Sequence, residues 1–432
     1  MKAIVLAGGK GTRLGLDDIP KALAPIDGVP LLERTVRNAV RDGFTDFVFL
    51  TGHMAEAIEK HFGDGSRFGA QIAYVVEREP LGTAGSFNQI RELLTEPFLV
   101  IYGDVLMDVD LAAFSRFGVE KGGAGTLFVH PNDHPFDSDL VESDCDNRIV
   151  AFHPKPHEEA NHYPNLVSAA LYVLAPAALD FIPPGGVYDW GRDVFPRFSG
   201  AAPLYAYRSC EYVKDMGTPD RLDQVEQDLR SGKVERLSLR NRKPALFLDR
   251  DGVINVEING VHSPGHVELI PGAAEAIRAF NNLGVPVVCV TNQPDLAKGF
   301  MSWEDLRAVG GEIDGQLAAS AGAYLDDIRV CPHHPERGWP GEVKSLKVEC
   351  ECRKPKPGML RDAALFHNID LSRSWLIGDR YADIAAAQAA GARSILVLTG
   401  HAGDDRSRFD CEPQQICDDL ASASKIVLEA LA

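Results

Sequence analysis

The sequence lacks several features that would place a protein in a membrane or on nucleic acid. Its 432 residues contain no run of eighteen or more apolar side chains, so we expect no membrane-spanning helix and no membrane partner. Basic residues are in the minority, 44 against 62 acidic ones, and the net charge of −18 argues against a nucleic-acid partner. Met1 leads directly into the strand-like Ala3–Ala7, which leaves no room for a signal peptide and indicates a cytoplasmic protein.

Cysteine is also scarce, and its placement is uneven. Of the eight cysteines, only Cys331, Cys350 and Cys352 form a cluster in the sequence. In a cytoplasmic chain such a cluster indicates metal ligands sooner than disulfides. The length is too great for one ordinary hydrophobic core, and it indicates two or three domains.

Short apolar runs alternate with amphipathic stretches along both halves of the chain. This alternation predicts βαβ units and a mainly parallel sheet in each half, and therefore an α/β fold. The strands expected in the first half are Ala3–Ala7, Phe47–Thr51, Gln71–Val76, Phe98–Tyr102 and Gly125–His130, with helices at Leu31–Arg41 and Ala55–His61. Those expected in the second half are Ala245–Leu248, Val285–Thr291, Ile328–Cys331, Trp375–Ile377 and Ser394–Leu398. A polar and basic stretch predicts a linker at residues 231–243, between domains at 1–230 and 244–432.

A glycine-rich loop follows the first expected strand, where residues Leu6–Gly15 read LAGGKGTRLG. Glycines let backbone N–H groups approach phosphate oxygens closely, and Lys10 and Arg13 add positive charge. A plain turn between strand and helix would explain a bare glycine pair equally well. Here, however, further motifs follow in order: IPKAL at 19–23, EPLGTAG at 79–85, YGD at 102–104, HPKP at 153–156 and VKDMGTP at 213–219.

This assembly resembles the sugar-1-phosphate nucleotidyltransferases over residues 1–225. The resemblance implies a Rossmann-like domain that joins a nucleoside triphosphate to a sugar 1-phosphate and releases pyrophosphate. The two reacting anions repel each other, and cations together with Mg²⁺ must offset that repulsion. The residues implied to handle the nucleotide are Gly8, Gly9, Gly11, Thr12, Arg13, Lys21, Gly82 and Thr83, of which Arg13 and Lys21 also offset charge during catalysis. The remaining implied site residues are Asp104 and Asp215 as Mg²⁺ ligands and Lys155 as a contact of the sugar phosphate.

A second motif suited to phosphate chemistry opens the second half of the chain. Residues Phe247–Asn255 read FLDRDGVIN, so Asp249 and Asp251 follow directly on an expected strand. Two such carboxylates can share a Mg²⁺, and one can attack phosphorus while the other handles the leaving-group proton. An aspartate-rich turn is the alternative for this motif alone. Three more motifs nevertheless follow in order: VTNQ at 290–293, RKPKP at 353–357 and IGDR at 377–380.

These four motifs resemble those of the haloacid dehalogenase phosphatases, across residues 244–430. The resemblance implies a second Rossmann-like domain, in which Asp249 is the nucleophile that forms an aspartyl-phosphate and Asp251 is the general acid and base. The implied contacts of the phosphoryl group are Thr291, Asn292 and Lys354. The implied Mg²⁺ ligands are Asp249, Asp251 and Asp379, with Asp383 as a supporting carboxylate.

The clustered cysteines complete a metal-ligand pattern in this half. Cys331 with His333, and Cys350 with Cys352, supply three thiolates and one imidazole, a closed tetrahedral set for a structural Zn²⁺. Free cysteines at loop ends are the alternative. His334 could take the place of His333, but the alternating pattern favours His333. The ion would fix the loop that leads into Lys354.

Among these phosphatases, the zinc loop that runs into RKPKPGM resembles that of the heptose-1,7-bisphosphate 7-phosphatases, with histidinol-phosphate phosphatases as close relatives. Arg353 then becomes a candidate contact of the second phosphate. Together the resemblances imply a bifunctional enzyme that removes the 7-phosphate of D-glycero-D-manno-heptose 1,7-bisphosphate and transfers a nucleotidyl group to heptose 1-phosphate. The expected partners are small molecules, namely heptose phosphates and GTP or another NTP.

Two alternatives stay open at this point. One keeps the fold but changes the substrates, to mannose 1-phosphate or another hexose 1-phosphate and to a different phosphatase substrate such as histidinol phosphate. The other is a regulatory protein with degenerate sites that binds nucleotides or sugar phosphates without turning them over.

Overall fold

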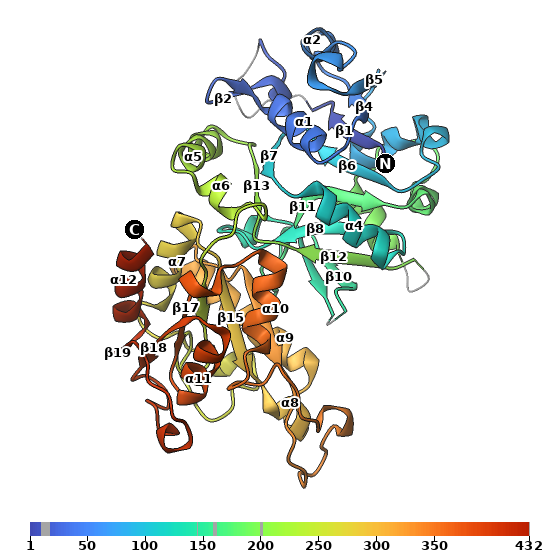
Figure 1. Cartoon of the computed structure of the whole chain (residues 1–432). Coiled ribbons are helices and arrows are strands. Elements are labelled where there is room, and N and C mark those ends of the chain that lie inside the picture. Colours follow the sequence, from blue (N-terminus) through green and yellow to red (C-terminus); the bar gives the residue numbers. More distant parts are fainter. Residues whose placement is uncertain (10–17, 145, 159–161, 199–201, 432) are drawn as a thin grey trace. The chain divides into compact units, whose positions relative to one another are not determined.

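The computed structural model describes residues 1–9, 18–144, 146–158, 162–198 and 202–431, and in these the chain folds into two compact units (Figure 1). Unit 1 comprises Met1–His130, Asp139–Lys155 and Val167–Ser238, and unit 2 comprises Pro131–Ser138, Pro156–Leu166 and Leu239–Ala432. Both units combine helices with a sheet that has parallel strands at its centre, so the predicted α/β class is confirmed. Among the described residues, no helix has both the length and the apolar composition that a membrane span requires.

The described part of unit 1 is built on a nine-stranded sheet. Its main path runs β10-β9-β11-β6-β1-β4-β5, and β8 and β12 extend it from β11. Strands β6, β1, β4 and β5 are parallel, whereas β11 is antiparallel to β6. Two short ribbons, β2–β3 and β7–β13, accompany this sheet. The strands are β1 (Ala3–Ala7), β2 (Pro25–Ile26), β3 (Val29–Pro30), β4 (Asp46–Thr51), β5 (Gln71–Val76), β6 (Phe98–Tyr102), β7 (Val105–Asp108), β8 (Gly125–His130), β9 (Leu140–Ser143), β10 (Ile149–His153), β11 (Val167–Leu174), β12 (Leu204–Arg208) and β13 (Tyr212–Asp215).

The helices of unit 1 include one in the segment that we expected to be a linker. Helix α6 forms there because Val234 and Leu237 are buried in an apolar cluster that also contains Val225 of α5. Asp110 is the N-cap of helix α4, because its carboxylate accepts a hydrogen bond from the N–H of Ala113 at 2.8 Å. The helices are α1 (Leu31–Arg41), α2 (Ala55–Phe62), α3 (Gly82–Gly85), α4 (Leu111–Lys121), α5 (Pro219–Arg230) and α6 (Lys233–Leu237).

Unit 2 contains a six-stranded parallel sheet with the order β16-β15-β14-β17-β18-β19. Its strands are β14 (Leu246–Leu248), β15 (Val287–Asn292), β16 (Asp327–Cys331), β17 (Trp375–Gly378), β18 (Arg393–Val397) and β19 (Gln415–Cys417). Its helices are α7 (Ala273–Leu283), α8 (Pro294–Lys298), α9 (Trp303–Ala321), α10 (Gly358–His367), α11 (Tyr381–Ala390) and α12 (Leu420–Leu431). The five strands predicted for this half of the chain are therefore confirmed, and each of their ends lies within two residues of its predicted position.

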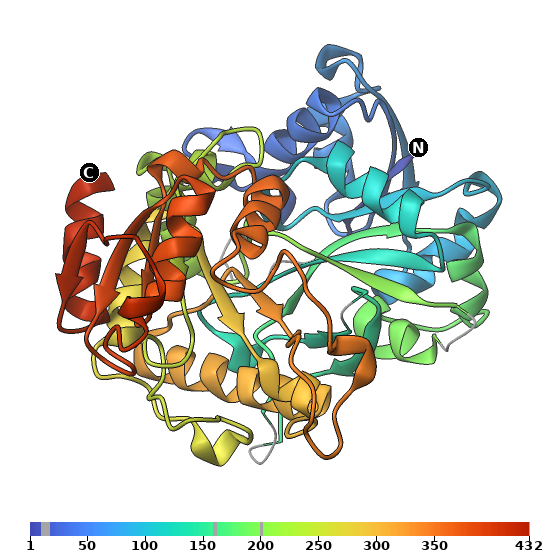
Figure 2. The ribbon, with the colours of Figure 1, turned by 60° about the horizontal axis from the view of Figure 1, so that its bottom comes forward.

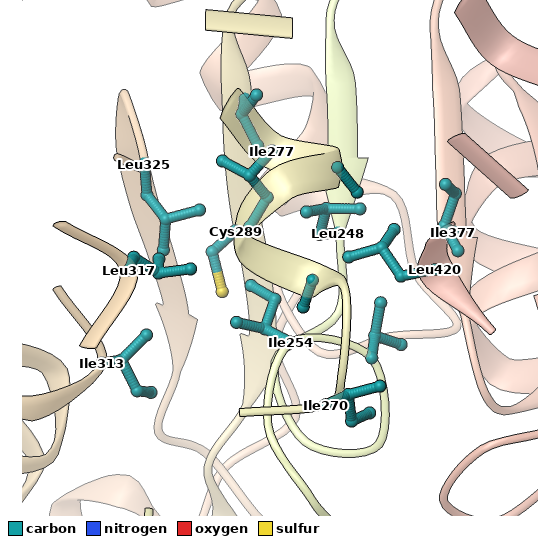
Figure 3. Close-up of a cluster of buried hydrophobic side chains, with 14 of the residues drawn as sticks. Leu248, Ile254, Ile270, Ile277, Cys289, Ile313, Leu317, Leu325, Ile377 and Leu420 are labelled. Atoms are coloured by element: carbon teal, nitrogen blue, oxygen red, sulfur yellow. The ribbon is translucent and has the colours of Figure 1, made fainter. Parts of the chain in front are cut away.

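Both faces of this sheet are covered, which explains why its strands are apolar throughout. Leu246 and Leu248 of β14 lie in a buried cluster with residues of α7, α9 and α12, and Figure 3 shows Leu248 there with Ile277 and Leu420. Phe247, between them, lies in a separate cluster with residues of α10 and α11. Helix α9 packs beside α7 (Figure 2). Because all the strands are parallel, their carboxyl ends meet at one edge, where ligands bind in such sheets.

Candidate active sites

Residues from the four C-terminal motifs meet at this edge of the unit 2 sheet. Asp249 follows β14, Thr291 lies near the end of β15 and Asp379 follows β17. Together with Arg353 and Lys354, which precede α10, they line a cavity of about 480 Å³. The structure therefore brings together side chains that stand up to 130 positions apart in the sequence, as Asp249 and Asp379 do.

Lys354 is the central cation of this edge. Its side chain is 2% exposed, and its ammonium lies 2.8 Å from Oδ1 of Asp249 and 2.6 Å from Oδ1 of Asp383. It also donates a hydrogen bond to the carbonyl oxygen of Val290 at 2.8 Å. Burial disfavours the charged amine, but the two carboxylates outweigh burial and raise the pKa of Lys354. Lys354 is therefore a fixed positive charge, suited to hold a phosphoryl group.

Three carboxylates crowd around this lysine. Oxygens of Asp249, Asp379 and Asp383 lie within 4.8 Å of one another. Burial first, and then repulsion among the carboxylates, raises the pKa of both Asp249 and Asp379 despite the attraction of Lys354. Oδ1 of Asp379 is buried and has no hydrogen-bond partner among the described residues, while its Oδ2 accepts from the N–H of His401 at 2.7 Å. A divalent cation with oxygen ligands fits this group, because it would offset the repulsion and use the unpartnered oxygen.

Two glycines that we did not predict as site residues pack against Asp379. A Cβ atom at Gly252 would lie 2.5 Å from Oδ2 of Asp379, and one at Gly400 would lie 2.3 Å from it. Both residues also have a positive φ, 81° and 60°. Their signal in the sequence is only a glycine after a strand, which is too common to assign a role on its own.

The crowded carboxylates lead to a prediction about pH and Mg²⁺. Since the pKa values of Asp249 and Asp379 are raised above about 3.9, the value in an unfolded chain, the ion-free folded protein binds the extra protons. This contribution to stability is fully present below about pH 4 and is lost as the pH rises through the raised values. Added Mg²⁺ should therefore raise the melting temperature of unit 2 more at pH 8 than at pH 5, by about 2–4 °C for each kcal/mol of binding.

Calorimetry of the full chain with and without Mg²⁺ checks this expectation, and Asp379→Asn is the control that should lose most of the pH dependence. An equal effect of Mg²⁺ at both pH values would contradict the assignment of the cation to these carboxylates.

The carboxylate of Asp251 lies outside this group of three. The Arg250 guanidinium holds both of its oxygens at 2.8–3.1 Å, and Asn255 and Gln293 each donate to it at 2.9 Å. Burial alone would raise the pKa of Asp251, but Arg250 and these hydrogen bonds leave it below its ordinary value. Asp251 is therefore a carboxylate at neutral pH, ready to accept a proton.

Asn292 and Gln293, both in the VTNQ motif, contact residues of two of the other three motifs. The side chain of Asn292 exchanges two hydrogen bonds with the backbone of Lys354, each of 3.1 Å, and so fixes the position of that lysine. Gln293, which we did not predict, donates to the hydroxyl of Thr291 and to Asp251, both at 2.9 Å. Thr291 itself lines the cavity, as a contact of a bound phosphoryl group must.

The clustered cysteines meet as the sequence predicts. Donor atoms of Cys331, His333, Cys350 and Cys352 lie within 4.8 Å of one another, with sulfur–sulfur distances of 3.2–3.6 Å. A tetrahedral Zn²⁺ with bonds of about 2.3 Å needs sulfurs roughly 3.8 Å apart, close to this spacing. The Cys331 thiol and burial raise the pKa of Cys352, and burial mainly raises that of Cys350. A bound divalent cation would reverse both effects by holding the thiolates.

The structure distinguishes the two neighbouring histidines. Nδ1 of His333 lies 3.3 Å from the sulfur of Cys352, inside the cluster. The ring of His334 instead packs edge-on against Trp339, with centroids 5.1 Å apart. The carbonyl oxygen of His333 also accepts a hydrogen bond from Arg353 at 3.2 Å. A metal at this site would therefore fix Arg353 and the Lys354 that follows it.

In unit 1 the structure brings Lys21, Asp104 and Asp215 to one place. Lys21 lies 2.6 Å from Oδ2 of Asp104, which sits in the turn between β6 and β7. Strand β13 pairs with β7 so that Asp215 stands opposite Val105, the residue after Asp104. Arg221 lies 2.7 Å from both oxygens of Asp215. One carboxylate in this turn and one at the end of the neighbouring strand β13 suit a shared cation, and here two basic side chains neutralise them.

Gly82 and Thr83 hold a loop at the edge of a second cavity. Thr83 donates to Oδ2 of Asp189 at 2.6 Å and accepts from the N–H of Trp190 at 3.0 Å. Gly82 has φ +76°, and a Cβ there would lie 2.3 Å from the carbonyl oxygen of Tyr188. The cavity of about 150 Å³ is lined by residues that include Tyr102, Asp139, His153, Ser168, Tyr172 and Asp189. Their hydroxyl and carboxylate groups suit a polyhydroxylated ligand.

The other predicted residues of unit 1 are only partly placed. Gly8 and Gly9 follow the end of β1, and a Cβ at Gly9 would meet nothing within 4 Å. Gly11, Thr12 and Arg13 lie outside the described residues. The exposed Lys155 ends a segment of unit 1, and its N–H donates to Asp139 at 3.2 Å.

The two sites define an enzyme of nucleotidyl transfer and phosphate-ester hydrolysis, with one α/β domain for each reaction. The chain belongs to the nucleotidyl transferase family, whose model matches residues 2–232, and the HAD-hydrolase-like model matches residues 351–423.

Three relatives each match part of the chain. A D-glycero-beta-D-manno-heptose-1,7-bisphosphate 7-phosphatase of Vibrio cholerae is 45% identical over 159 residues, 37% of this chain and 83% of the relative. A D-glycero-D-manno-heptose-1,7-bisphosphate 7-phosphatase of Thermosynechococcus vestitus is 38% identical over 195 residues, 44% of this chain and 98% of the relative. A UTP–glucose-1-phosphate uridylyltransferase of Synechocystis is 31% identical over 301 residues, 65% of this chain and 70% of the relative.

Proposed function

We propose that this chain carries out two consecutive steps on one sugar. Its C-terminal domain, residues 244–432, removes the 7-phosphate of D-glycero-D-manno-heptose 1,7-bisphosphate. Its N-terminal domain, residues 1–230, then joins the heptose 1-phosphate to a nucleotidyl group, GMP from GTP. The observation that carries this proposal is the buried Lys354 held between Asp249 and Asp383, beside the unpartnered oxygen of Asp379. Similarity to the two bisphosphate phosphatases supports the choice of substrate.

In the phosphatase reaction, Asp249 attacks phosphorus and the bond to the sugar oxygen breaks, giving an aspartyl-phosphate. The leaving oxygen takes a proton from Asp251, which must first be protonated and released from Arg250. Water then hydrolyses the acyl phosphate, and Asp251 accepts its proton. Lys354 and Thr291 hold the phosphoryl oxygens, and Arg353 takes the second phosphate. A Mg²⁺ held by Asp249 and Asp379 would neutralise charge on the phosphoryl group.

In the transferase reaction, a phosphate oxygen of the heptose 1-phosphate attacks the α-phosphorus and pyrophosphate leaves. Lys21 and Arg13 offset the charge on the triphosphate, while Gly8, Gly9, Gly11 and Thr12 surround it. Lys155 holds the sugar phosphate, and Gly82 and Thr83 flank the nucleoside. A Mg²⁺ held by Asp104 and Asp215 would neutralise the reacting phosphates.

The proposal is tested by supplying the heptose bisphosphate with each of GTP, ATP, UTP and CTP and measuring phosphate, pyrophosphate and nucleotide sugar. We expect release of both ions and formation of GDP-heptose. A hexose 1-phosphate with UTP is the second candidate for the transferase, because the Synechocystis relative, named for that reaction, covers 65% of this chain. Formation of UDP-glucose without any heptose product would favour that candidate.

Asp215→Asn should lower the rate of pyrophosphate release by about 10²-fold or more, because losing an anionic ligand of a catalytic cation removes several kcal/mol of charge stabilisation. Phosphate release should not change. Initial rates with saturating substrates check this, and Asp220→Asn, an exposed carboxylate in the first turn of α5, is the matched control. Equal rates for both variants would remove Asp215 from the proposed site.

A further inference from the structure

The candidate sugar cavity of unit 1 is lined by side chains that carry acidic rather than basic charge. Its polar groups are the phenols of Tyr102 and Tyr172, the hydroxyl of Ser168, the imidazole of His153 and the carboxylates of Asp139 and Asp189. Among the described residues, no lysine or arginine lines this cavity. The imidazole of His153 has its Nε2 3.4 Å from Oε2 of Glu142, a further carboxylate.

In the described part of the chain, the two carboxylates of the lining accept hydrogen bonds from neutral donors. Oδ2 of Asp189 accepts from the hydroxyl of Thr83 at 2.6 Å, and its Oδ1 accepts from the backbone N–H of Arg192 at 3.0 Å. The guanidinium of Arg192 binds Asp193 instead, at 3.1 Å. Oδ1 of Asp139 accepts from a backbone N–H at 3.2 Å. Both carboxylates therefore keep their negative charge toward the cavity.

Two tyrosines of the lining lie within the electrostatic field of Asp189. The rings of Tyr102 and Tyr172 meet edge to face, with centroids 5.8 Å apart. Burial raises the pKa of both phenols, and the charge of Asp189 raises it further. The phenols are therefore neutral at physiological pH. They can form hydrogen bonds with sugar hydroxyls, but they carry no positive charge that would offset an added anion.

Strand β11 is irregular where it borders the cavity. Its pairing with β8 shifts between Ser168 and Tyr172, and Ala170 between them has a φ of +55°. Residues other than glycine rarely adopt such a φ. Irregular pairing and strained backbone of this kind are frequent beside active sites. Because Ser168, Ala170 and Tyr172 all line the cavity, this strain supports its assignment as the sugar pocket.

Lys155 indicates which end of the sugar enters this cavity. It is exposed and directly follows Pro154, which belongs to the lining. In the proposed function Lys155 holds the 1-phosphate, so that phosphate stays at the rim and the other carbons of the sugar reach the lining. A second phosphate on those carbons would bring a charge of about −1.5 to −2 at pH 7 toward Asp139 and Asp189.

We propose that Asp189, together with Asp139, makes the transferase selective for sugar 1-phosphates that carry no second phosphate. This inference rests on the proposed function of unit 1 and names the property of the substrate that its cavity selects. Sugar hydroxyls can donate hydrogen bonds to the carboxylates, whereas a phosphate dianion has no proton to donate and is repelled by them. The charge of the cavity thus ensures that the 7-phosphate is removed before the nucleotidyl group is transferred.

Asp189→Asn separates the charge of this side chain from its shape. The amide has the same size and can still form hydrogen bonds with Thr83 and Arg192. The full chain carrying Asp249→Asn is the background, because it leaves the 7-phosphate on the substrate. Pyrophosphate release is measured with GTP and either heptose 1-phosphate or heptose 1,7-bisphosphate, and the two kcat/KM values are compared. Asp223→Asn, an exposed carboxylate of α5 outside the cavity, is the matched control.

In the background variant we expect kcat/KM for the monophosphate to exceed that for the bisphosphate by about 10²-fold or more. Asp189→Asn should lower this ratio about tenfold by improving the use of the bisphosphate, and Asp139→Asn should act in the same direction. Asp223→Asn should leave the ratio unchanged. A merely structural role of Asp189 would lower both kcat/KM values together. An unchanged ratio in both Asp189→Asn and Asp139→Asn would therefore overturn the inference.

The inference and the proposed function fail in different ways. Equal use of the two heptose phosphates by the background variant would overturn the inference and leave the proposed function in place. If neither heptose phosphate releases pyrophosphate, the proposed substrate is wrong, and the ratio is measured with UTP and glucose 1-phosphate against glucose 1,6-bisphosphate. A large ratio that falls in Asp189→Asn would then support the inference, and a ratio near one would overturn it. No pyrophosphate from any of the four sugar phosphates would overturn both.

Discussion

Asp249→Asn should abolish phosphate release from the heptose bisphosphate, by about 10⁴-fold or more, because removal of a nucleophile costs most of the catalysis that depends on it. An amide in the same place has the shape of the carboxylate but cannot form the acyl phosphate. Pyrophosphate release from heptose 1-phosphate and GTP should continue at the wild-type rate. The two rates, measured with separate colorimetric assays on the same preparation, check the expectation.

We expect that a lower stability of the Asp249→Asn variant does not explain its loss of phosphate release. Asp249 is one of three crowded carboxylates, and burial and its neighbours raise its pKa, so a neutral amide relieves repulsion in the ion-free protein. The melting temperature of Asp249→Asn should therefore be at least that of the wild type. Asp362→Asn, an exposed aspartate of α10, is the control and should keep both activities. Loss of both activities in Asp249→Asn would contradict the assignment of one reaction to each domain.

Cys352→Ser should remove the Zn²⁺ from the chain and with it the phosphatase activity. Wild-type protein should contain about one equivalent of zinc, because three thiolates and one imidazole close a tetrahedral site. Without the ion, Cys350 and Cys352 no longer hold the loop that continues into Arg353 and Lys354, so we expect phosphate release to fall by about 10²-fold or more. Elemental analysis and initial rates measure both effects.

Two further observations make the zinc experiment specific. The ring of Trp339 packs against His334, and its centroid lies 4.0 Å from the ammonium of Lys347, so the fluorescence of Trp339 should change when the loop loses its ion. Cys417→Ser, in β19 and outside the cluster, should keep the metal, the fluorescence and both activities. A Cys352→Ser variant that keeps a full equivalent of zinc would show that another set of residues binds it.

Patterns in the sequence predict the sheets well, because a buried parallel strand needs a continuous apolar run. The predicted strand Phe98–Tyr102, for example, is strand β6 of the structure, with the same first and last residues. Helix α6 escaped prediction, since its five residues include only two buried apolar side chains, Val234 and Leu237, among charged neighbours. Its formation depends on the apolar cluster that covers it, which no local pattern reveals.

For the site, order and spacing of motifs predicted which side chains would meet but not what each would contact. Asp249, Thr291 and Asp379 meet as expected because each follows or borders a strand end of the same sheet. Lys354, which precedes α10, lines the same cavity. Asp383, by contrast, takes a place beside Asp249 and Asp379 that we had expected for Asp251. The reason is the neighbouring Arg250, whose guanidinium turns the carboxylate of Asp251 toward itself.

The same limit applies to contacts between distant segments of unit 2. The contacts of Asn165 with Asp314 and of Asp133 with Arg278 join residues 149 and 145 positions apart. Such pairs carry no signal in one sequence, because neither partner belongs to a recognisable motif. They become visible only when the fold places the segments on α7 and α9.

The central claim, that one chain removes the 7-phosphate and then activates carbon 1, is tested most directly by following a single reaction with ³¹P NMR. The wild-type protein is mixed with heptose 1,7-bisphosphate, GTP and Mg²⁺, and the monoester, inorganic phosphate and diphosphate signals are recorded over time. We predict that inorganic phosphate and heptose 1-phosphate appear first and that the diphosphate of a nucleotide sugar without a 7-phosphate follows. A nucleotide sugar that still carries its 7-phosphate, or no nucleotide sugar with any of the four triphosphates, would contradict the account.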